Sequence, residues 1–272
     1  MRTLIVNADD FGWSESVNRG IIDAARNGIV TSTSIIANAP GFDDAVARAK
    51  GMLELGVGIH LNIFRMHPLL PKAEVPTLVN KEGNFFGNAG NIALRTFFGF
   101  IKTEEVEKEW RAQIRKVKAA GIIPTHFDSE KHLHLLPPFF TIALRLAQEF
   151  GIRHIRVVRE PFSLNVKSLI LRMLSAWNAP RALRAGLRVV DGTIGVANAP
   201  HSRDALLRLL KQAKGASVEL ISHPGLLNAS FWEMQKSVPN ALTTQREEEQ
   251  KVLADRGARA LVAQRGFTLA HF

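Results

Sequence analysis

Short apolar runs alternate with segments of helical periodicity along this chain, and this alternation constrains the fold more than any other feature. After the run Thr3–Asn7, residues Val17, Ile21 and Ala25 share one helix face. Repeated strand and helix units of this kind build a largely parallel sheet, so the sequence predicts an α/β fold. We expect its strands at Thr3–Asn7, Thr31–Ala37, Val57–Asn62, Pro124–Asp128, Ile152–Val158, Ser217–Ser222 and Phe267–Ala270.

Helix ends carry recognisable capping residues. Ser14 is expected to cap the first helix, and Gly28 to end it. Thr244, followed three residues later by Glu247, has the spacing of a capping box for the last helix. Helical order should also run through Pro138–Phe150.

The chain of 272 residues fits one large domain as well as two small ones, because α/β barrels reach this size. No internal repeat or low-complexity tract stands out. We expect a single domain, 1–272, with insertions at about 63–102 and 160–200, where the periodicity weakens.

Composition limits the possible partners and the possible metal ligands. The chain has no cysteine, so any metal must bind nitrogen and oxygen ligands. It has neither a signal-peptide core nor a run of about 18 apolar residues, which predicts a soluble, cytoplasmic protein. A formal net charge of +10 favours an anionic partner such as membrane headgroups or nucleic acid. No nucleic-acid-binding signature is present, so nucleic acid is not expected.

Potential metal ligands are concentrated in one segment. The ten residues 125–134 hold three of the nine histidines and two carboxylates, directly after an apolar entry. In extended chain, Glu130, His132 and His134 alternate onto the same side. Ligand density of this kind is typical of a metal site in an enzyme.

The other candidate site residues also follow predicted strands. Asp9 and Asp10 follow the first strand, His60 ends the third, and His223 follows Ser217–Ser222. Because the carboxyl ends of parallel strands gather at one face, these side chains are expected to meet. Taken singly, each has a simpler interpretation as a turn residue or a buried core histidine. Their common position favours a shared site.

These motifs together resemble the YdjC-like carbohydrate deacetylases, a family that includes chitooligosaccharide deacetylase. The resemblance runs in order from residue 3 to about 225, with 63–102 and 160–200 poorly covered. It rests on the segments Asn7–Gly12, Thr31–Ser34, Gly58–Leu61, Thr125–Ser129, His132–His134 and His223–Gly225. It implies an irregular (β/α) barrel that removes N-acetyl groups from amino sugars with a divalent metal.

The resemblance also implies roles for single residues. Asp9 would be the catalytic base, Asp10 and His60 metal ligands, and His223 a catalytic or substrate-binding group. The family usually has a histidine as third ligand where this chain has Glu130. Two carboxylates and one imidazole tolerate magnesium or manganese as well as zinc. His132 or His134 is the substitute ligand if Glu130 does not bind.

The segment Ser129–Leu135 is similar to the hopanoid-biosynthesis branch of the family, which implies an N-acetylglucosaminyl hopanoid lipid as substrate. Apolar residues with basic neighbours at 94–102 and 167–181 agree with contact at an anionic membrane surface. The alternative is that these helices pack on the barrel and keep only basic rims in solvent. Soluble chitooligosaccharides stay an alternative substrate, and the sequence leaves a homodimer open.

The expected chemistry is hydrolysis of an acetamide by metal-activated water, with Asp9 as base and His223 as acid. Two other functions compete with it. One is metal-dependent hydrolysis of another bond, such as a phosphoester. The other is a non-enzymatic basic protein that binds membranes or nucleic acid, which leaves the common position of the site residues unexplained.

Overall fold

A parallel sheet organises the molecule, as the computed structural model shows for residues 2–161, 165–238 and 242–272. The strand order is β5-β4-β3-β2-β1-β7-β6. The eighth strand, β8, pairs with Arg2–Ile5 of β1, on the side that β2 occupies farther along. The strands are β1 (Arg2–Phe11), β2 (Ser32–Ile35), β3 (Gly56–Leu61), β4 (His126–Ser129), β5 (His154–Ile155), β6 (Gly192–Ile194), β7 (Ser217–Ser222) and β8 (Phe267–Ala270).

The two ends of the sheet approach each other and give an irregular barrel. Beyond β5, His154 forms an isolated parallel bridge with Arg188. The Thr193 N–H donates to the Arg159 carbonyl over 3.2 Å, and the Thr193 hydroxyl accepts from the Arg159 N–H. These few bonds replace a regular β5–β6 ladder. The expected α/β fold with an irregular barrel is therefore confirmed.

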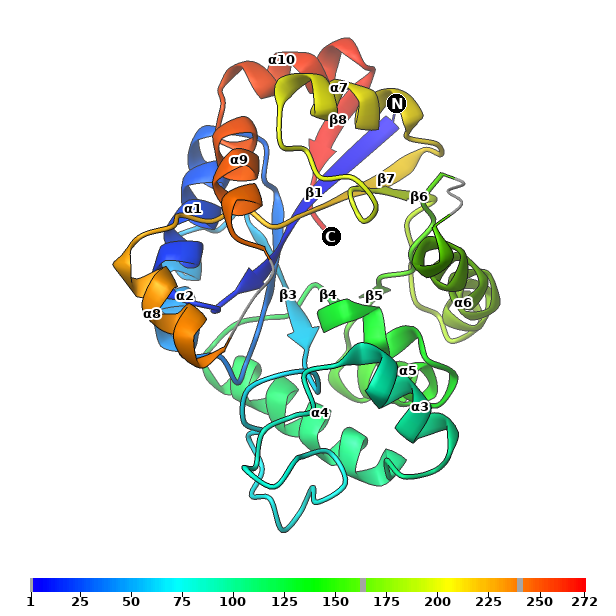
Figure 1. Ribbon diagram of the computed structural model, residues 1–272. Coiled ribbons are helices and arrows are strands. Elements are labelled where there is room, and N and C mark those ends of the chain that lie inside the picture. Colours follow the sequence, from blue (N-terminus) through cyan, green and yellow to red (C-terminus); the bar gives the residue numbers. More distant parts are fainter. Residues whose placement is uncertain (1, 162–164, 239–241) are drawn as a thin grey trace.

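Helices cover the outside of the sheet (Figure 1). Ser14 caps α1 as predicted, because its hydroxyl accepts a hydrogen bond from the Val17 N–H. The helices are α1 (Glu15–Asn27), α2 (Phe42–Ala49), α3 (Ala89–Phe97), α4 (Thr103–Ala119), α5 (Pro137–Phe150), α6 (Val166–Arg184), α7 (Arg203–Gln212), α8 (Ala229–Ser237), α9 (Thr244–Leu253) and α10 (Gly257–Gln264), with a 3-10 turn η1 (Glu130–Leu135).

Two predicted elements were wrong in detail. The strand expected at Ile152–Val158 keeps ladder geometry only over His154–Ile155. Beyond it, side chains of other elements take the N–H groups, as the Ser175 hydroxyl does for Val158. The capping box at Thr244 does not form, since Thr244 is already helical and Thr243 precedes it without a side-chain bond.

The two predicted insertions hold elements of their own. Segment 63–102 contains α3, and segment 160–200 contains α6 and β6. Residues 162–164, within the second segment, lie outside the described residues. The division into one domain with two insertions stays a prediction.

Candidate active site

A cavity of about 210 Å³ lies at the carboxyl ends of the strands. Six of the seven predicted site residues line it, from β1, β3, η1 and the loop after β7: Asp9, Asp10, His60, Glu130, His132 and His223. The convergence expected from the strand ends therefore takes place. Other lining residues include Arg65, Lys131, Lys167, Ile221 and Gln245.

An irregularity in β1 turns two consecutive carboxylates toward the same cavity. In a regular strand, neighbouring side chains point to opposite faces. Here the pairing of β1 with β2 shifts register between Ala8 and Phe11, and Asp10 has a left-handed backbone with φ 68°. A bulge of this kind redirects a side chain. Asp9 and Asp10 can therefore serve one site.

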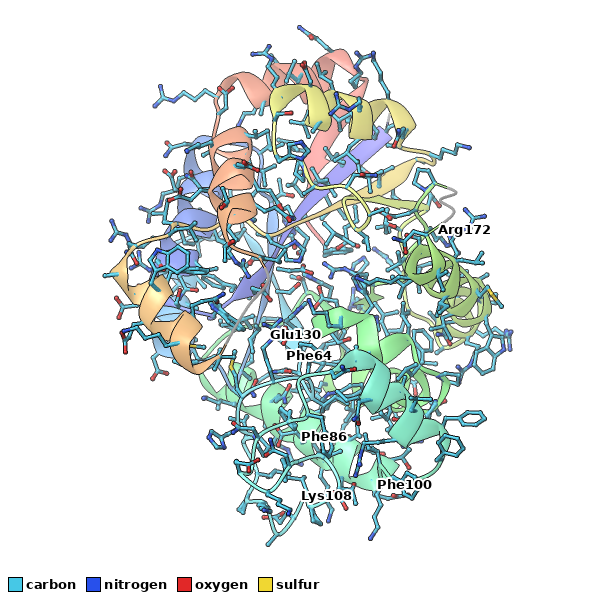
Figure 2. All side chains as sticks on the ribbon, in the orientation of Figure 1. Phe64, Phe86, Phe100, Lys108, Glu130 and Arg172 are labelled. Carbon is cyan, nitrogen blue, oxygen red and sulfur yellow. The ribbon has the colours of Figure 1, made fainter. Side chains whose placement is uncertain are left out.

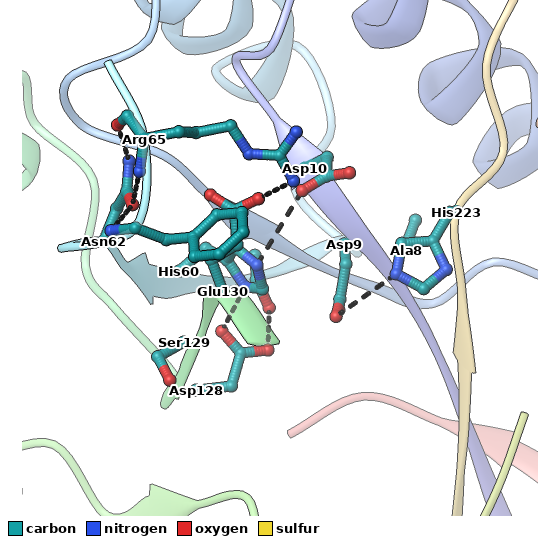
Figure 3. Close-up of polar contacts among 12 residues, drawn as sticks. Ala8, Asp9, Asp10, His60, Asn62, Arg65, Asp128, Ser129, Glu130 and His223 are labelled. Carbon is teal, nitrogen blue, oxygen red and sulfur yellow. Dashed lines mark hydrogen bonds and ion pairs between the residues drawn. The ribbon is translucent and has the colours of Figure 1, made fainter. Parts of the chain in front are cut away.

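His60 lies between two carboxylates (Figure 3). Its Nδ1 is 2.7 Å from Oδ1 of Asp128, and its Nε2 is 3.8 Å from Oδ1 of Asp10. Burial opposes a proton on His60, but Asp128, Asp9 and Asp10 outweigh it and raise the pKa to about 9. The Asp128 contact also fixes the ring, which leaves Nε2 directed at the cavity.

Arg156 connects the buried carboxylates below the cavity. Its guanidinium lies 2.7 Å from each of Asp9, Asp128 and Glu219, and it is fully buried. Two guanidinium nitrogens donate to the two oxygens of Asp9. Burial raises the pKa of Glu219 to about 7, although Arg156 opposes the shift. Arg156 thus holds Asp9 in a fixed orientation at the cavity floor.

Helix α9 supports the opposite wall. Arg246 forms a buried ion pair with Asp10, and the Glu249 carboxylate accepts the His223 N–H over 2.7 Å. Burial would raise the pKa of Asp10, but Arg246, His223 and His60 hold it well below its usual range. Nε2 of His223 lies 4.0 Å from Oδ2 of Asp9, and the side chain is partly exposed. His223 can therefore meet both solvent and substrate.

The segment after β4 does not continue as extended chain. Lys131 and His132 both have left-handed backbones, with φ 54° and 56°, so η1 turns sharply. The expected alternation of Glu130, His132 and His134 onto one side was wrong for this reason. His134 is absent from the cavity lining, and its two ring nitrogens contact the Ser129 hydroxyl and the Arg156 carbonyl. His132 lines the cavity, and its buried Nδ1 has no hydrogen-bond partner among the described residues.

Among the described residues, a single group of three donors lies close enough together to hold a divalent cation, and it includes His60. Asp9, His60 and Asp128 offer atoms within 4.8 Å of one another, but both carboxylates already bind Arg156. The predicted set of Asp10, His60 and Glu130 does not bring three ligand atoms that close together, and its carboxylates pair with Arg246 and Arg65. Ligand atoms bound at about 2.0–2.2 Å to one ion lie roughly 3–3.5 Å apart, close to the 3.8 Å between His60 and Asp10.

Glu130 is the third member of the predicted ligand set. Its side chain is buried and its Oε1 forms an ion pair with Arg65, whereas Oε2 has no hydrogen-bond partner among the described residues. Unpartnered buried carboxylate oxygens are unusual. Two carboxylates and an imidazole are a chemically suitable set for a divalent cation.

Several residues of the site escaped the sequence-based reasoning. Arg156, Glu219 and Arg246 were not singled out, and Asp128 was noted only as part of its motif. A signal was present for two of them: Arg156 and Glu219 are charges inside apolar strand-like runs. A charge at such a position needs a buried partner. Arg246 lies on a strongly polar helix, where its sequence neighbours give no such signal.

Comparisons with known proteins place the chain among related sequences. A family model described as YdjC-like protein matches residues 3–264. A carbohydrate deacetylase of Geobacillus stearothermophilus is 32% identical over 98% of this chain and 96% of that protein. One of Clostridium beijerinckii is 34% identical over 84% and 83%. One of Brevibacillus brevis is 42% identical, but the alignment covers only 57% of that relative.

The fold also has a solved counterpart. A crystal structure from Enterococcus faecalis, of a protein named for cellobiose-phosphate cleavage, superposes with a TM-score of 0.79 at 27% identity. The superposition covers 99% of this chain and 97% of that one. The similarity therefore extends over the whole barrel, including the two segments that the motifs cover poorly.

Proposed function

Because this chain belongs to the YdjC-like family, we propose that it is a carbohydrate deacetylase that hydrolyses the N-acetyl group of an N-acetylglucosamine-type sugar. The observation that carries the proposal is the convergence of Asp9, Asp10, His60 and His223 in one cavity. Relatives that align along nearly the whole chain are named carbohydrate deacetylases, which supports the same activity.

We propose that His60, Asp10 and Glu130 would hold a divalent metal, with zinc, magnesium or manganese as candidates, because two carboxylates and an imidazole suit these ions. Such an ion would polarise the acetyl carbonyl and lower the pKa of a bound water. Asp128 holds His60 through Nδ1, as carboxylates commonly orient metal-binding histidines. His132 is the substitute ligand if Glu130 stays with Arg65.

The proposed proton transfers use the two residues that face each other across the cavity. Asp9, oriented by Arg156, takes a proton from the water whose oxygen adds to the acetyl carbon. His223 gives a proton to the sugar nitrogen as the C–N bond breaks. The products are acetate and the free amine. The partly exposed position of His223 lets it regain its proton from solvent.

Substitution of Asp9 tests the reaction. Asp9→Asn keeps the shape but cannot take the proton, so acetate release should fall by about 10²–10⁴-fold. Metal content, measured by elemental analysis, should stay that of the unaltered protein, whereas Asp10→Asn and His60→Gln should lower it. A fully active Asp9→Asn protein would contradict the assignment.

The metal ligands can be assigned without measuring activity. If Asp10 and Glu130 bind the ion, Asp10→Asn and Glu130→Gln should each weaken metal binding more than Asp128→Asn. The reverse order would favour the group Asp9, His60 and Asp128. Titration of the metal-free protein with Zn²⁺ and Mn²⁺ gives the affinities.

A lipid-linked sugar, such as an N-acetylglucosaminyl hopanoid, is the substrate that we favour. A cavity of about 210 Å³ is smaller than the roughly 300–1,000 Å³ of sites that enclose a whole ligand, so the rest of the substrate lies outside. Exposed apolar side chains on α3 and α6 suit a lipid there. Acetate release from the hopanoid should exceed that from chitobiose. Activity on chitobiose alone would make soluble chitooligosaccharides the substrate.

Two other functions are separated by simple measurements. A phosphoester hydrolase would release phosphate rather than acetate. A non-enzymatic basic protein would bind anionic surfaces equally well after Asp10→Ala and His60→Ala.

A cytoplasmic location at the inner membrane surface belongs to the proposal. Among the described residues, none of the helices has both the length and the apolar character to span a bilayer.

A further inference from the structure

Helix α6 turns its apolar side toward solvent. Val166, Ile170, Met173 and Trp177 follow helical spacing along one face, where Met173 is 65% and Trp177 53% exposed. The buried positions are mostly small or polar: Ser168, Leu171, Ser175, Asn178, Ala179 and Ala182. A helix on a water-soluble domain normally shows the opposite pattern. This face is therefore suited to a partner other than water.

A second exposed apolar group lies at the end of α3. Phe97 is 82% exposed, and Phe98 and Phe100 are also mostly exposed. The Phe98 ring contacts both others, with its centroid 5.2 Å from that of Phe97 and 6.4 Å from that of Phe100. We call these aromatic residues and the exposed face of α6 the α3–α6 surface. Clustered exposed aromatics usually mark an interaction site.

The α3–α6 surface borders the mouth of the cavity. Both α3 and α6 contact η1, and Glu130, Lys131 and His132 of η1 line the cavity. Lys167, in the first turn of α6, lines it too. Figure 2 shows Phe100 near α3 and Arg172 on α6 on the same side of the molecule, with Glu130 toward the centre. A partner on this surface would lie beside the substrate's entrance.

The two segments that carry the surface hold basic residues as their only charged side chains. Segment 89–102 contains Arg95 and Lys102 and no acidic residue, and α6 contains four basic residues and no acidic one. We propose that the α3–α6 surface docks on an anionic lipid bilayer, with its aromatic and aliphatic side chains in the interfacial layer. Exposed aromatic and apolar side chains among Lys and Arg are the combination that such interfaces bind.

A bilayer fits this surface better than a second copy of the chain. In a symmetric dimer, the same patch on both subunits meets itself, so Lys102, Lys167 and Arg184 would face like charges. An anionic bilayer instead offers opposite charge and an apolar layer together. This role of the surface rests on the proposed function in one respect: the docked cavity would receive a sugar whose lipid stays in the membrane.

Vesicle binding tests the surface without any turnover. The protein should sediment with vesicles of phosphatidylcholine and phosphatidylglycerol, bind less to phosphatidylcholine alone, and dissociate as salt is raised. The variant Phe97→Ser/Phe98→Ser/Phe100→Ser should bind at least tenfold more weakly. The α6 variant Met173→Ser/Trp177→Ser should also bind these vesicles at least tenfold more weakly.

Leu53→Ser is the matched control. Leu53 is 98% exposed, but it precedes β3, at the end of the barrel opposite the cavity, so its loss should leave vesicle binding unchanged. In a Trp232→Phe background, Trp177 is the remaining tryptophan at the surface, and its fluorescence should shift to the blue on anionic vesicles.

Several outcomes would overturn the docking proposal. One is that the unaltered protein does not bind vesicles. Another is that the triple phenylalanine variant binds them as well as the unaltered protein. The third is that the unaltered protein self-associates without binding vesicles and the triple variant does not self-associate. The proposed function is judged separately, by acetate release from N-acetylglucosaminyl hopanoid or from soluble chitobiose, measured without vesicles. If the protein releases acetate but does not bind vesicles, the docking proposal alone is overturned. If it binds vesicles but releases no acetate, the deacetylase proposal alone is overturned.

Discussion

Arg156 is the residue that pairs with three of the buried carboxylates of the site. It contacts three carboxylates at 2.7 Å, and its side chain has no exposure. Taking these charges out of water is expensive, and their mutual attraction offsets the expense only while the set is complete. The pKa of Arg156 lies well above its ordinary value because the carboxylates outweigh the effect of burial.

Removal of Arg156 should therefore be severely destabilising. Arg156→Met leaves Asp9, Asp128 and Glu219 without their cation, and we expect a loss of about 3–5 kcal/mol in the free energy of unfolding. Urea denaturation at neutral pH measures it. Arg156→Lys, which keeps the charge but not the paired donors, should lose less.

Arg111 provides the matched control. It also binds two carboxylates, Glu107 and Glu149, but these pairs lie at the surface of α4 and α5. Because solvent screens such pairs, Arg111→Met should change the free energy of unfolding by only about 0.2–1 kcal/mol. Equal losses at Arg111 and Arg156 would show that burial is not what makes Arg156 important.

At the scale of elements, a capping residue stabilised a helix start only where the backbone placed it at the N-cap position. Ser14 lies just before α1, and its hydroxyl accepts the Val17 N–H over 3.3 Å. Thr244 has a similar pattern in sequence but begins one position too late to cap α9. The register of a helix end, which tertiary packing sets, decides whether a capping residue contributes.

Substitutions at the two helix starts should separate these cases. Ser14→Ala removes a real cap and should lower the free energy of unfolding by about 1 kcal/mol. Thr244→Ala removes no cap bond and should change it by a few tenths at most. Thermal unfolding of the two variants side by side gives the comparison, and equal losses would contradict it.

The join between β6 and β7 should make stability depend on pH. The Asp191 carboxylate accepts hydrogen bonds from the N–H groups of Ser217 and Ala216, and these bonds lower its pKa below the ordinary 3.8. A lowered pKa contributes stability that is present above about 3.8 and is lost as the pH falls through the folded value. The carboxylate is largely exposed, so we expect at most about 1 kcal/mol.

The variant Asp191→Ala should therefore be less stable than the unaltered protein at neutral pH, and the difference should shrink as the pH falls below 3.8. Urea midpoints at a series of pH values measure it. Asp191→Asn cannot ionise, so its difference from Asp191→Ala should stay constant with pH. If the difference in stability between Asp191→Ala and the unaltered protein did not change with pH, Asp191 would be excluded as the titrating group.

At the scale of the whole molecule, the barrel interior is filled by side chains from distant strands. His126 of β4 lies against Gly58 of β3, within reach of the Ser34 hydroxyl of β2, and its ring centroid is 4.2 Å from that of the tilted Phe272 ring. Burial lowers the pKa of His126 to about 3, so its ring is neutral near pH 7. This packed layer supports the floor of the cavity.

Gly58→Ala should disturb that layer. A Cβ at Gly58 would overlap the His126 ring, which is fully buried and contacts the hydroxyls of Ser34 and Thr125. We expect a loss of about 1–3 kcal/mol, as for other overpacked interiors. Gly99→Ala is the control for loss of a glycine, because nothing lies within 4 Å of a Cβ there and only its positive φ is strained. A Gly58→Ala protein as stable as the unaltered one would contradict the packing.

The sequence by itself determined the α/β class, most strands and the residues that gather at the strand ends. It could do so because strand and helix periodicities are local, and because parallel strands end on one face whatever their order. His60 and His223 were found in this way. The same reasoning found the late strand Phe267–Ala270 but not its place beside β1.

Only the tertiary structure decided how these residues face one another. The bulge that turns both Asp9 and Asp10 into the cavity depends on the pairing of β1 with β2, and the left-handed turn of η1 directs His134 away. Arg156 and Arg246 reach their carboxylates from 147 and 236 positions away. Such contacts depend on how elements pack across the whole barrel, and no local pattern in the chain predicts a contact between residues so far apart in sequence.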